Sequence, residues 1–195
     1  MNRSAWHAAA SDSVTQQIVQ LHAPDTESRP LAKLSGGEER QIIGWREWVS
    51  LPDLGLKSIK AKVDTGARTS SLHAYNVEEF KLNGRKMVRF VLHPEQRSVK
   101  ETVHTEAPLI DHRRVKPSSG HSELRPVILT TVELMGKRWE VELTLTRRDE
   151  MGFRMLLGRQ AMRGQFVVDP GRSYLNGKRI KGKKRLMKKP KGKTR

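Results

Sequence analysis

The chain has 195 residues, of which 35% are hydrophobic and 30% are charged, enough for one ordinary domain with polar flanking segments. It contains no cysteine, which excludes disulfides, thiolate zinc sites and cysteine nucleophiles, and this fits a reducing compartment. No apolar run approaches the ~20 residues of a membrane span, and residues 1–10 lack the apolar core of a signal peptide. We therefore expect a cytoplasmic protein without membrane contact.

The net charge of +17 is concentrated at the C-terminal end. Eleven lysines and arginines, and no acidic residue, lie in residues 178–195. A Lys/Gly/Arg-rich segment cannot bury a core, so we expect a disordered tail that binds polyanions by counterion release. This predicts contact with the ribosome, RNA or another acidic partner; a solvated tail without a specific partner is the alternative.

The first forty residues are polar and weakly patterned. Residues 12–21 have the spacing of a short helix. Residues 34–41 resemble the signature loop of ATP-binding-cassette ATPases, but the chain has no G-x-x-x-x-G-K-[ST] loop to hold the phosphates. We therefore expect a flexible linker there and divide the chain into a flexible segment (1–40), a β domain (41–177) and a basic tail (178–195).

From Ile42 onward the sequence alternates short β-type runs with turn signals. Asn83-Gly84 is typical of a type I′ hairpin turn, and Met135-Gly136-Lys137 is expected to form a second turn. Within this region the only helical pattern is one or two turns over residues 158–162. Many short strands with almost no helix predict an all-β closed sheet or sandwich. The strands are expected over residues 42–49, 59–63, 70–75, 80–82, 86–92, 99–110, 127–134, 138–146, 155–157 and 166–168.

The second of these strands leads into Asp64-Thr65-Gly66-Ala67. Strands are depleted in aspartate and glycine, so both at a strand end indicate a tight polar turn. An Asx-type turn with a purely structural role is one interpretation of these residues. An aspartate presented for catalysis is the other.

A second motif, Met155-Leu156-Leu157-Gly158-Arg159, favours catalysis. A strand followed by Asp-Thr-Gly-Ala, and later by apolar-apolar-Gly-Arg and a short helix, resembles the retropepsin-like aspartic peptidases. Together with the segment from Arg113 to Val127, these motifs resemble one bacterial family of that group, which carries the name ATP-dependent zinc protease and is associated with a ribosomal-protein glutamate ligase. The resemblance covers roughly residues 40–175 and implies a closed retropepsin-like barrel, the acid-protease fold. It also implies that Leu157, Gly158 and Arg159 support the catalytic loop.

The zinc and ATP in that family name have no counterpart among the motifs. The chain has no H-E-x-x-H pair, and its histidines from residue 73 onward are scattered through expected strands and loops. We therefore predict no metal and no cofactor, and keep a zinc-dependent peptidase as an alternative.

The resemblance implies catalysis by two carboxylates that share one proton. Only one Asp-Thr-Gly is present, so the simplest arrangement is a homodimer in which each subunit supplies Asp64. Thr65 would brace the paired loops and Gly66 would leave room for substrate. A monomer that uses Asp64 as a turn residue, in a binding module for the ribosome, RNA or an acidic protein, is the alternative.

The cleft is expected to bind negative charge. Arg68 stands where viral retropepsins commonly carry an acid, so Arg159 needs another partner, and residues 111–125 are the expected flap. Arginines can bind carboxylates with two hydrogen bonds at once, although a solvated basic loop is equally compatible with the sequence. We thus predict an aspartic endopeptidase for acidic, glutamate-rich peptides or protein tails. Its substrate-binding residues would be Ala67, Arg68, Arg113, Arg114, Lys116 and Arg125.

Overall fold

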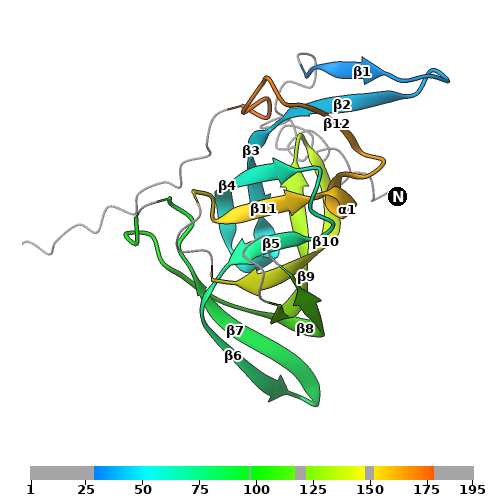
Figure 1. The fold of residues 1–195 in the computed structure, drawn as a ribbon. Helices are drawn as coiled ribbons and strands as arrows, with labels where there is room; N and C mark the ends of the chain where they lie inside the picture. The colour runs from blue at the N-terminus through cyan, green and yellow to red at the C-terminus, as the bar shows by residue number, and fades with distance from the viewer. Residues whose placement is uncertain (1–28, 97, 117–121, 148–151, 178–195) are drawn as a thin grey trace, which may run out of the picture.

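The computed structural model describes residues 29–96, 98–116, 122–147 and 152–177. The expected helix over residues 12–21, the flap tip and the basic tail lie outside these residues. The described part is all-β, with one short helix and one 3-10 turn, as the sequence predicted (Figure 1). No helix in it is long and apolar enough to cross a membrane. The elements are β1 (Leu31–Lys33), β2 (Glu39–Gly44), β3 (Arg46–Leu51), η2 (Pro52–Leu54), β4 (Leu56–Asp64), β5 (Ser70–His73), β6 (Tyr75–Leu82), β7 (Arg85–Leu92), β8 (Val103–Val115), β9 (Glu123–Leu134), β10 (Lys137–Thr146), β11 (Met155–Gly158), α1 (Arg159–Met162) and β12 (Phe166–Asp169).

The body of the molecule is a closed barrel. Six strands follow one another in the order β10-β5-β11-β4-β3-β9, and pairing of β9 with β10 closes the ring. This confirms the closed retropepsin-like barrel. Alternate residues of these strands point inward, and their apolar side chains form one continuous core. Leu72, Leu143, Leu157 and Ala61 are completely buried in it.

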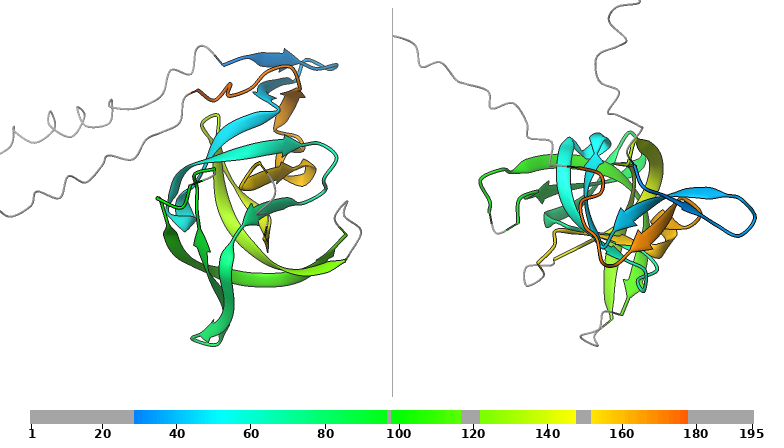
Figure 2. Two further views of the ribbon diagram at one scale, coloured as in Figure 1. Left: turned by 60° about the vertical axis from the view of Figure 1, so that its left-hand side comes forward. Right: turned by 90° about the horizontal axis from the view of Figure 1, so that it is seen from above.

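Two hairpins have their turns at the residues expected from the sequence. Asn83 and Gly84 have φ values of 50° and 78°, as a type I′ turn requires, and they join β6 to β7. Met135 and Gly136, at 54° and 75°, join β9 to β10. The β6–β7 hairpin projects from the barrel, and β8 continues from its edge into a long, curved hairpin with β9 (Figure 2). Strand β8 is longer than expected and shifted towards the C-terminus, because its first half pairs with β7 and its second half with β9.

The strand expected over residues 42–49 is two strands. The extended conformation is interrupted at Trp45, which lies between the two strands. Strand β2 is not part of the barrel but belongs to a separate three-stranded sheet of order β1-β2-β12. The break lies where residues 170–177, here called the C-terminal strap, press against Gly44: a Cβ there would lie 2.3 Å from the Arg172 carbonyl oxygen. Only glycine permits this approach.

The segment before residue 41 also differs from the expected linker. Residues 31–44 form a hairpin, in which β1 pairs with β2 through a turn containing Gly36 and Gly37 at positive φ. The short strand lacks a periodic apolar pattern. It is held by the backbone pairing of β2, which sequence patterning does not reveal.

The C-terminal strap is fixed by one buried carboxylate. Glu47 is fully buried, and its Oε1 accepts hydrogen bonds from the backbone N–H groups of Gly44 (2.7 Å) and Leu175 (2.9 Å). Its Oε2 accepts one from the N–H of Asn176 at 3.1 Å. The Asn176 side chain donates to the Trp48 carbonyl and accepts from the Met135 N–H, so the strap is joined to both β3 and the β9–β10 turn.

Candidate active site

Asp64 is the last residue of β4, and it is partly exposed. Its Oδ1 accepts hydrogen bonds from the N–H groups of Gly66 at 3.0 Å and Ala67 at 2.9 Å. Its Oδ2 has no hydrogen-bond partner among the described residues. One oxygen therefore fixes the carboxylate in place while the other stays open to a ligand. Thr65 and Gly66 are exposed next to it.

The second motif lies directly beside the first. Strand β11 runs parallel to β4 with Leu157 opposite Val63 and Gly158 opposite Asp64. The N–H of Arg159 donates to the Ala67 carbonyl at 2.8 Å, which ties the start of α1 to residues 65–69, here called the site loop. The two motifs, almost a hundred residues apart in the chain, thus form one unit.

Gly158 is required by the close approach of the site loop. A Cβ at this position would lie 2.5 Å from the backbone carbonyl atoms of Thr69. The Gly158 N–H donates to the buried hydroxyl of Ser70 at 3.0 Å. Ser70 is a support that the sequence analysis missed, since a serine at a strand start carries no distinctive pattern.

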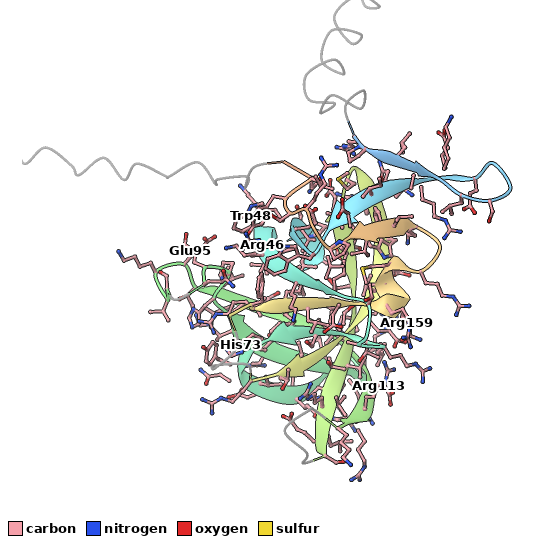
Figure 3. All side chains as sticks on the ribbon, turned by 45° about the horizontal axis from the view of Figure 1, so that its top comes forward. Arg46, Trp48, His73, Glu95, Arg113 and Arg159 are labelled. Atoms are coloured by element: carbon pink, nitrogen blue, oxygen red, sulfur yellow. The ribbon has the colours of Figure 1, made fainter. Side chains whose placement is uncertain are left out.

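The arginines near the loop have unequal surroundings. Arg159 lies at the end of β11 (Figure 3), and its Nη1 donates a hydrogen bond to the Thr65 carbonyl at 3.4 Å. This carbonyl is a partner for Arg159 in a chain that has Arg68 where viral retropepsins commonly carry an acid. Arg68 is exposed and has no ion-pair partner among the described residues. It therefore adds uncompensated positive charge beside Asp64.

The expected flap is the outer end of the β8–β9 hairpin. Arg113 Nη1 forms an ion pair with Glu142 of β10 at 2.8 Å, and its Nη2 lies 3.5 Å from Asp111. Arg125, largely buried, pairs with Glu123 at 2.7 Å. These two predicted substrate-binding arginines are thus already neutralised within the chain.

The other two predicted flap cations are exposed. Arg114 and Lys116 have no ion-pair partner in the part of the chain that the structure describes. Whether any of the four binds substrate stays a prediction, since the tip over residues 117–121 lies outside the described residues.

The histidines of the described residues are not arranged as a zinc centre. No three His, Asp or Glu side chains are grouped to hold a metal ion within the described ranges. His73 is buried and edge-on to Tyr75, and the Tyr75 hydroxyl accepts a hydrogen bond from Arg154. His112 of β8 pairs with Glu79 of β6 at 2.7 Å. These histidines are separate and have packing or ion-pair roles.

Residues 42–179 match the family model described as RimB-like, the retropepsin-like aspartic endopeptidase RimB. The chain belongs to this family. The match spans both motifs, so the Asp64 strand and the Gly158 strand are parts of one family pattern. The resemblance inferred from the sequence is confirmed.

Curated relatives carry a different name. A probable alpha-L-glutamate ligase of Shewanella pealeana is 50% identical over 142 residues, which are 73% of this chain and 31% of that protein. One from Desulfotalea psychrophila is 50% identical over 131 residues, 67% of this chain and 28% of that protein. The chain thus spans about a third of the length of these relatives.

A solved structure has the same fold. A Legionella pneumophila protein of unknown function, Lpg0085 (DUF785), superposes with a TM-score of 0.60 at 29% identity. The match covers 69% of this chain and 97% of that one. A region similar to this chain therefore makes up nearly all of that solved chain and about a third of the longer proteins named as ligases.

Proposed function

We propose that this RimB-like protein is an aspartic endopeptidase that acts as a homodimer, with Asp64 of each subunit in one shared site. The observation that carries the proposal is the Asp64 carboxylate, fixed through one oxygen by two backbone N–H groups and open at the other. No ion pair or hydrogen bond joins it to a second acidic side chain of the described residues. We therefore propose that the second carboxylate of the mechanism comes from another copy of the chain.

In the proposed reaction the two carboxylates share one proton. The ionised carboxylate accepts a proton from water while the resulting hydroxyl attacks the scissile carbonyl carbon. The protonated carboxylic acid donates its proton to the carbonyl oxygen, which gives a tetrahedral diol. Proton transfer to the amide nitrogen then breaks the C–N bond and releases amine and carboxylic acid. The water supplies the OH of the new carboxylic acid and the proton of the new amine, and the carboxylate pair ends with the one proton it began with, so the step needs neither zinc nor ATP.

The exposed site loop supports dimerisation, because Thr65 and Gly66 are uncovered in the isolated chain. The three-stranded sheet offers a second contact: β1 and β12 each pair on one side only in the described residues. An unpaired strand edge is a natural place for a second copy to add.

We propose acidic, glutamate-rich peptides or protein tails as the substrate. The similar proteins named alpha-L-glutamate ligases contain a domain like this one within the same chain. A hydrolase for glutamate-rich tails would act on the kind of bond that a glutamate ligase makes. The positive charge of Arg68 beside the site suits such a substrate.

Asp64→Asn tests the chemistry. The change preserves side-chain size and an acceptor for the site-loop N–H groups but removes the shared proton. Cleavage of a glutamate-oligomer peptide, followed by mass spectrometry, should fall at least about a hundredfold. Unchanged cleavage would exclude the proposal.

Mixing the two forms tests the shared site. Wild-type and Asp64→Asn chains are unfolded together and refolded at equal amounts, so that they pair at random. Activity per total protein should fall to about a quarter, because only dimers with two Asp64 carboxylates act. A fall to about half would mean that each subunit acts alone.

The basic tail gives a second, separate proposal: contact with ribosome or RNA through residues 178–195. Its support is the clustering of eleven lysines and arginines without an acid. Deleting the tail should abolish salt-sensitive binding to RNA while peptide cleavage continues. Retained binding would reject the tail as the contact.

A further inference from the structure

The outward face of β4 carries two lysines in line with Asp64. Ile59, Ala61 and Val63 point into the core and are at most 6% exposed. Strand alternation places Lys60, Lys62 and Asp64 on the opposite face. The candidate nucleophile-activating carboxylate is thus the last member of a row whose two earlier members are cations.

Neighbouring strands extend this row sideways. Arg46 of β3 pairs in register with Lys62, and Trp48 pairs with Lys60. On the other side, Leu156 of β11 is opposite Lys62, and Gly158 is opposite Asp64. Paired residues share a face of the sheet, so Arg46, Lys60 and Lys62, here called the basic row, lie on the Asp64 face.

The basic row is free of carboxylate partners within the described residues. The Arg46 guanidinium lies 4.5 Å from the ring centre of Trp45 and 4.9 Å from that of Tyr174. The Lys60 ammonium lies 5.3 Å from the ring centre of Trp48. Aromatic faces orient these cations without neutralising them. In contrast, Arg113 on the flap hairpin is bound to two acids.

A hollow lies beside the outer end of the row. A cavity of about 280 Å³ is lined by Trp48 and Lys60 together with residues 94–96. Figure 3 shows Arg46 and Trp48 grouped near Glu95, away from Arg159 at the far end of β11. This lining holds one acid, Glu95, and one cation, Lys60, while Lys62 and Arg46 add two further cations on the same face of the sheet.

We propose that the basic row is the subsite that binds substrate carboxylates on one side of the scissile bond. This inference rests on the proposed peptidase function. Side chains two residues apart in a strand are about 7 Å apart, and the same spacing separates alternate side chains of an extended peptide. Glutamates at alternate positions of a bound peptide therefore match Lys62 and Lys60. The nearer glutamate meets Lys62 and Arg46, and the farther one meets Lys60.

Binding is measured first, in the catalytically inactive Asp64→Asn protein. Fluorescence anisotropy with a labelled glutamate oligomer should show a loss of affinity of at least about threefold for each of Lys62→Glu and Lys60→Glu. Lys86→Glu is the matched control, since it changes net charge equally on the projecting β6–β7 hairpin. Equal losses of affinity in all three variants would mean that only the net charge of the protein matters, and would overturn the proposal that the basic row is a subsite. Circular dichroism confirms that each variant is folded.

Position-specific cleavage follows in the protein with Asp64 intact. Single Glu→Gln changes are placed along the peptide, and kcat/KM is compared between wild type and Lys62→Ala. Lys62→Ala should remove the preference for glutamate at one position only, and Lys60→Ala at a position two residues away. Preferences that are unchanged in both variants would overturn the inference while leaving the peptidase intact. Absence of cleavage by the wild-type protein would instead reject the proposed function. The affinity measurements would still show whether the basic row binds the glutamate oligomer.

Discussion

The site loop and the C-terminal strap each depend on one carboxylate, and the two are placed in opposite ways. Glu47 is fully buried, and three backbone N–H groups occupy both of its oxygens. Asp64 is partly exposed, and two N–H groups occupy one oxygen only. A buried carboxylate with both oxygens hydrogen-bonded to the backbone has a structural role. A carboxylate that is fixed through one oxygen, with the other accessible to a ligand, can take part in a reaction.

The same contrast separates the two groups of cations. Arg113 and Arg125 on the flap hairpin are paired with acids of their own chain, whereas Lys62 and Arg46 have no acidic partner in the part of the chain that the structure describes. Arginine-rich loops attract notice in a sequence because their charges are clustered. Availability for a ligand, however, depends on which acids the fold brings to them.

Removing the buried carboxylate of Glu47 should have the largest effect on stability. Glu47→Ala leaves three N–H groups without their acceptor in a dry site and should lower the free energy of unfolding by about 3 kcal/mol. Asp64→Ala should lower it by less than about 1 kcal/mol, since solvent can reach the site-loop N–H groups. Urea unfolding of both variants measures the difference. Equal losses would contradict the division into a structural and a reactive carboxylate.

Gly158→Ala should have the next largest effect. The new methyl group meets the Thr69 backbone, which cannot move without displacing the site loop, so we expect a loss of about 2 kcal/mol. Gly152→Ala is the control, because a Cβ there has no neighbour within 4 Å and φ is not positive. Thermal unfolding compares the two. A Gly158→Ala protein as stable as the control would mean that the site loop is not held against β11.

The strap can be loosened without touching Glu47. Asn176→Ala removes the hydrogen bonds to the Trp48 carbonyl and the Met135 N–H, both partly buried, and should cost about 1 kcal/mol. Hydrogen exchange should then accelerate at the Leu175 and Met135 amides but not at the Gly66 amide. Faster exchange at Gly66 would show that the strap and the site loop open together.

The smallest effect concerns an exposed carboxylate, Asp53. Hydrogen bonds from Thr131, the side chain first and then the backbone N–H, lower the pKa of Asp53 below its ordinary value of 3.8. A lowered folded pKa stabilises the protein above the unfolded pKa, and this contribution disappears as the pH falls through the folded value. Asp53→Asn should therefore cost less than about 1 kcal/mol at pH 7, and this cost should disappear once the pH falls below the lowered pKa of Asp53 in the folded protein. A cost that persists at low pH would assign the loss to packing instead.

Much of the barrel could be predicted from local patterns. The alternation in β10, the Asn83-Gly84 turn and the short helix after Gly158 are encoded by neighbouring residues, and the structure contains each of them. The break at Trp45 and the β1–β2 hairpin were missed, because the cause of the break is a strap 128 residues away and the hairpin depends on backbone pairing.

The sequence by itself determined the family, the closed β fold and Asp64 as the candidate reactive group, because two short motifs in a fixed order carry that information. Only the tertiary structure decided which supporting groups surround Asp64. Ser70 meets Gly158, Arg159 meets the Thr65 carbonyl, and Glu142 neutralises Arg113 through register and strand curvature. The lysines of β4 were visible in the sequence as alternate residues of one strand. Their place on the Asp64 face, beside Arg46, depends on strand pairing between separate segments, which no local pattern specifies.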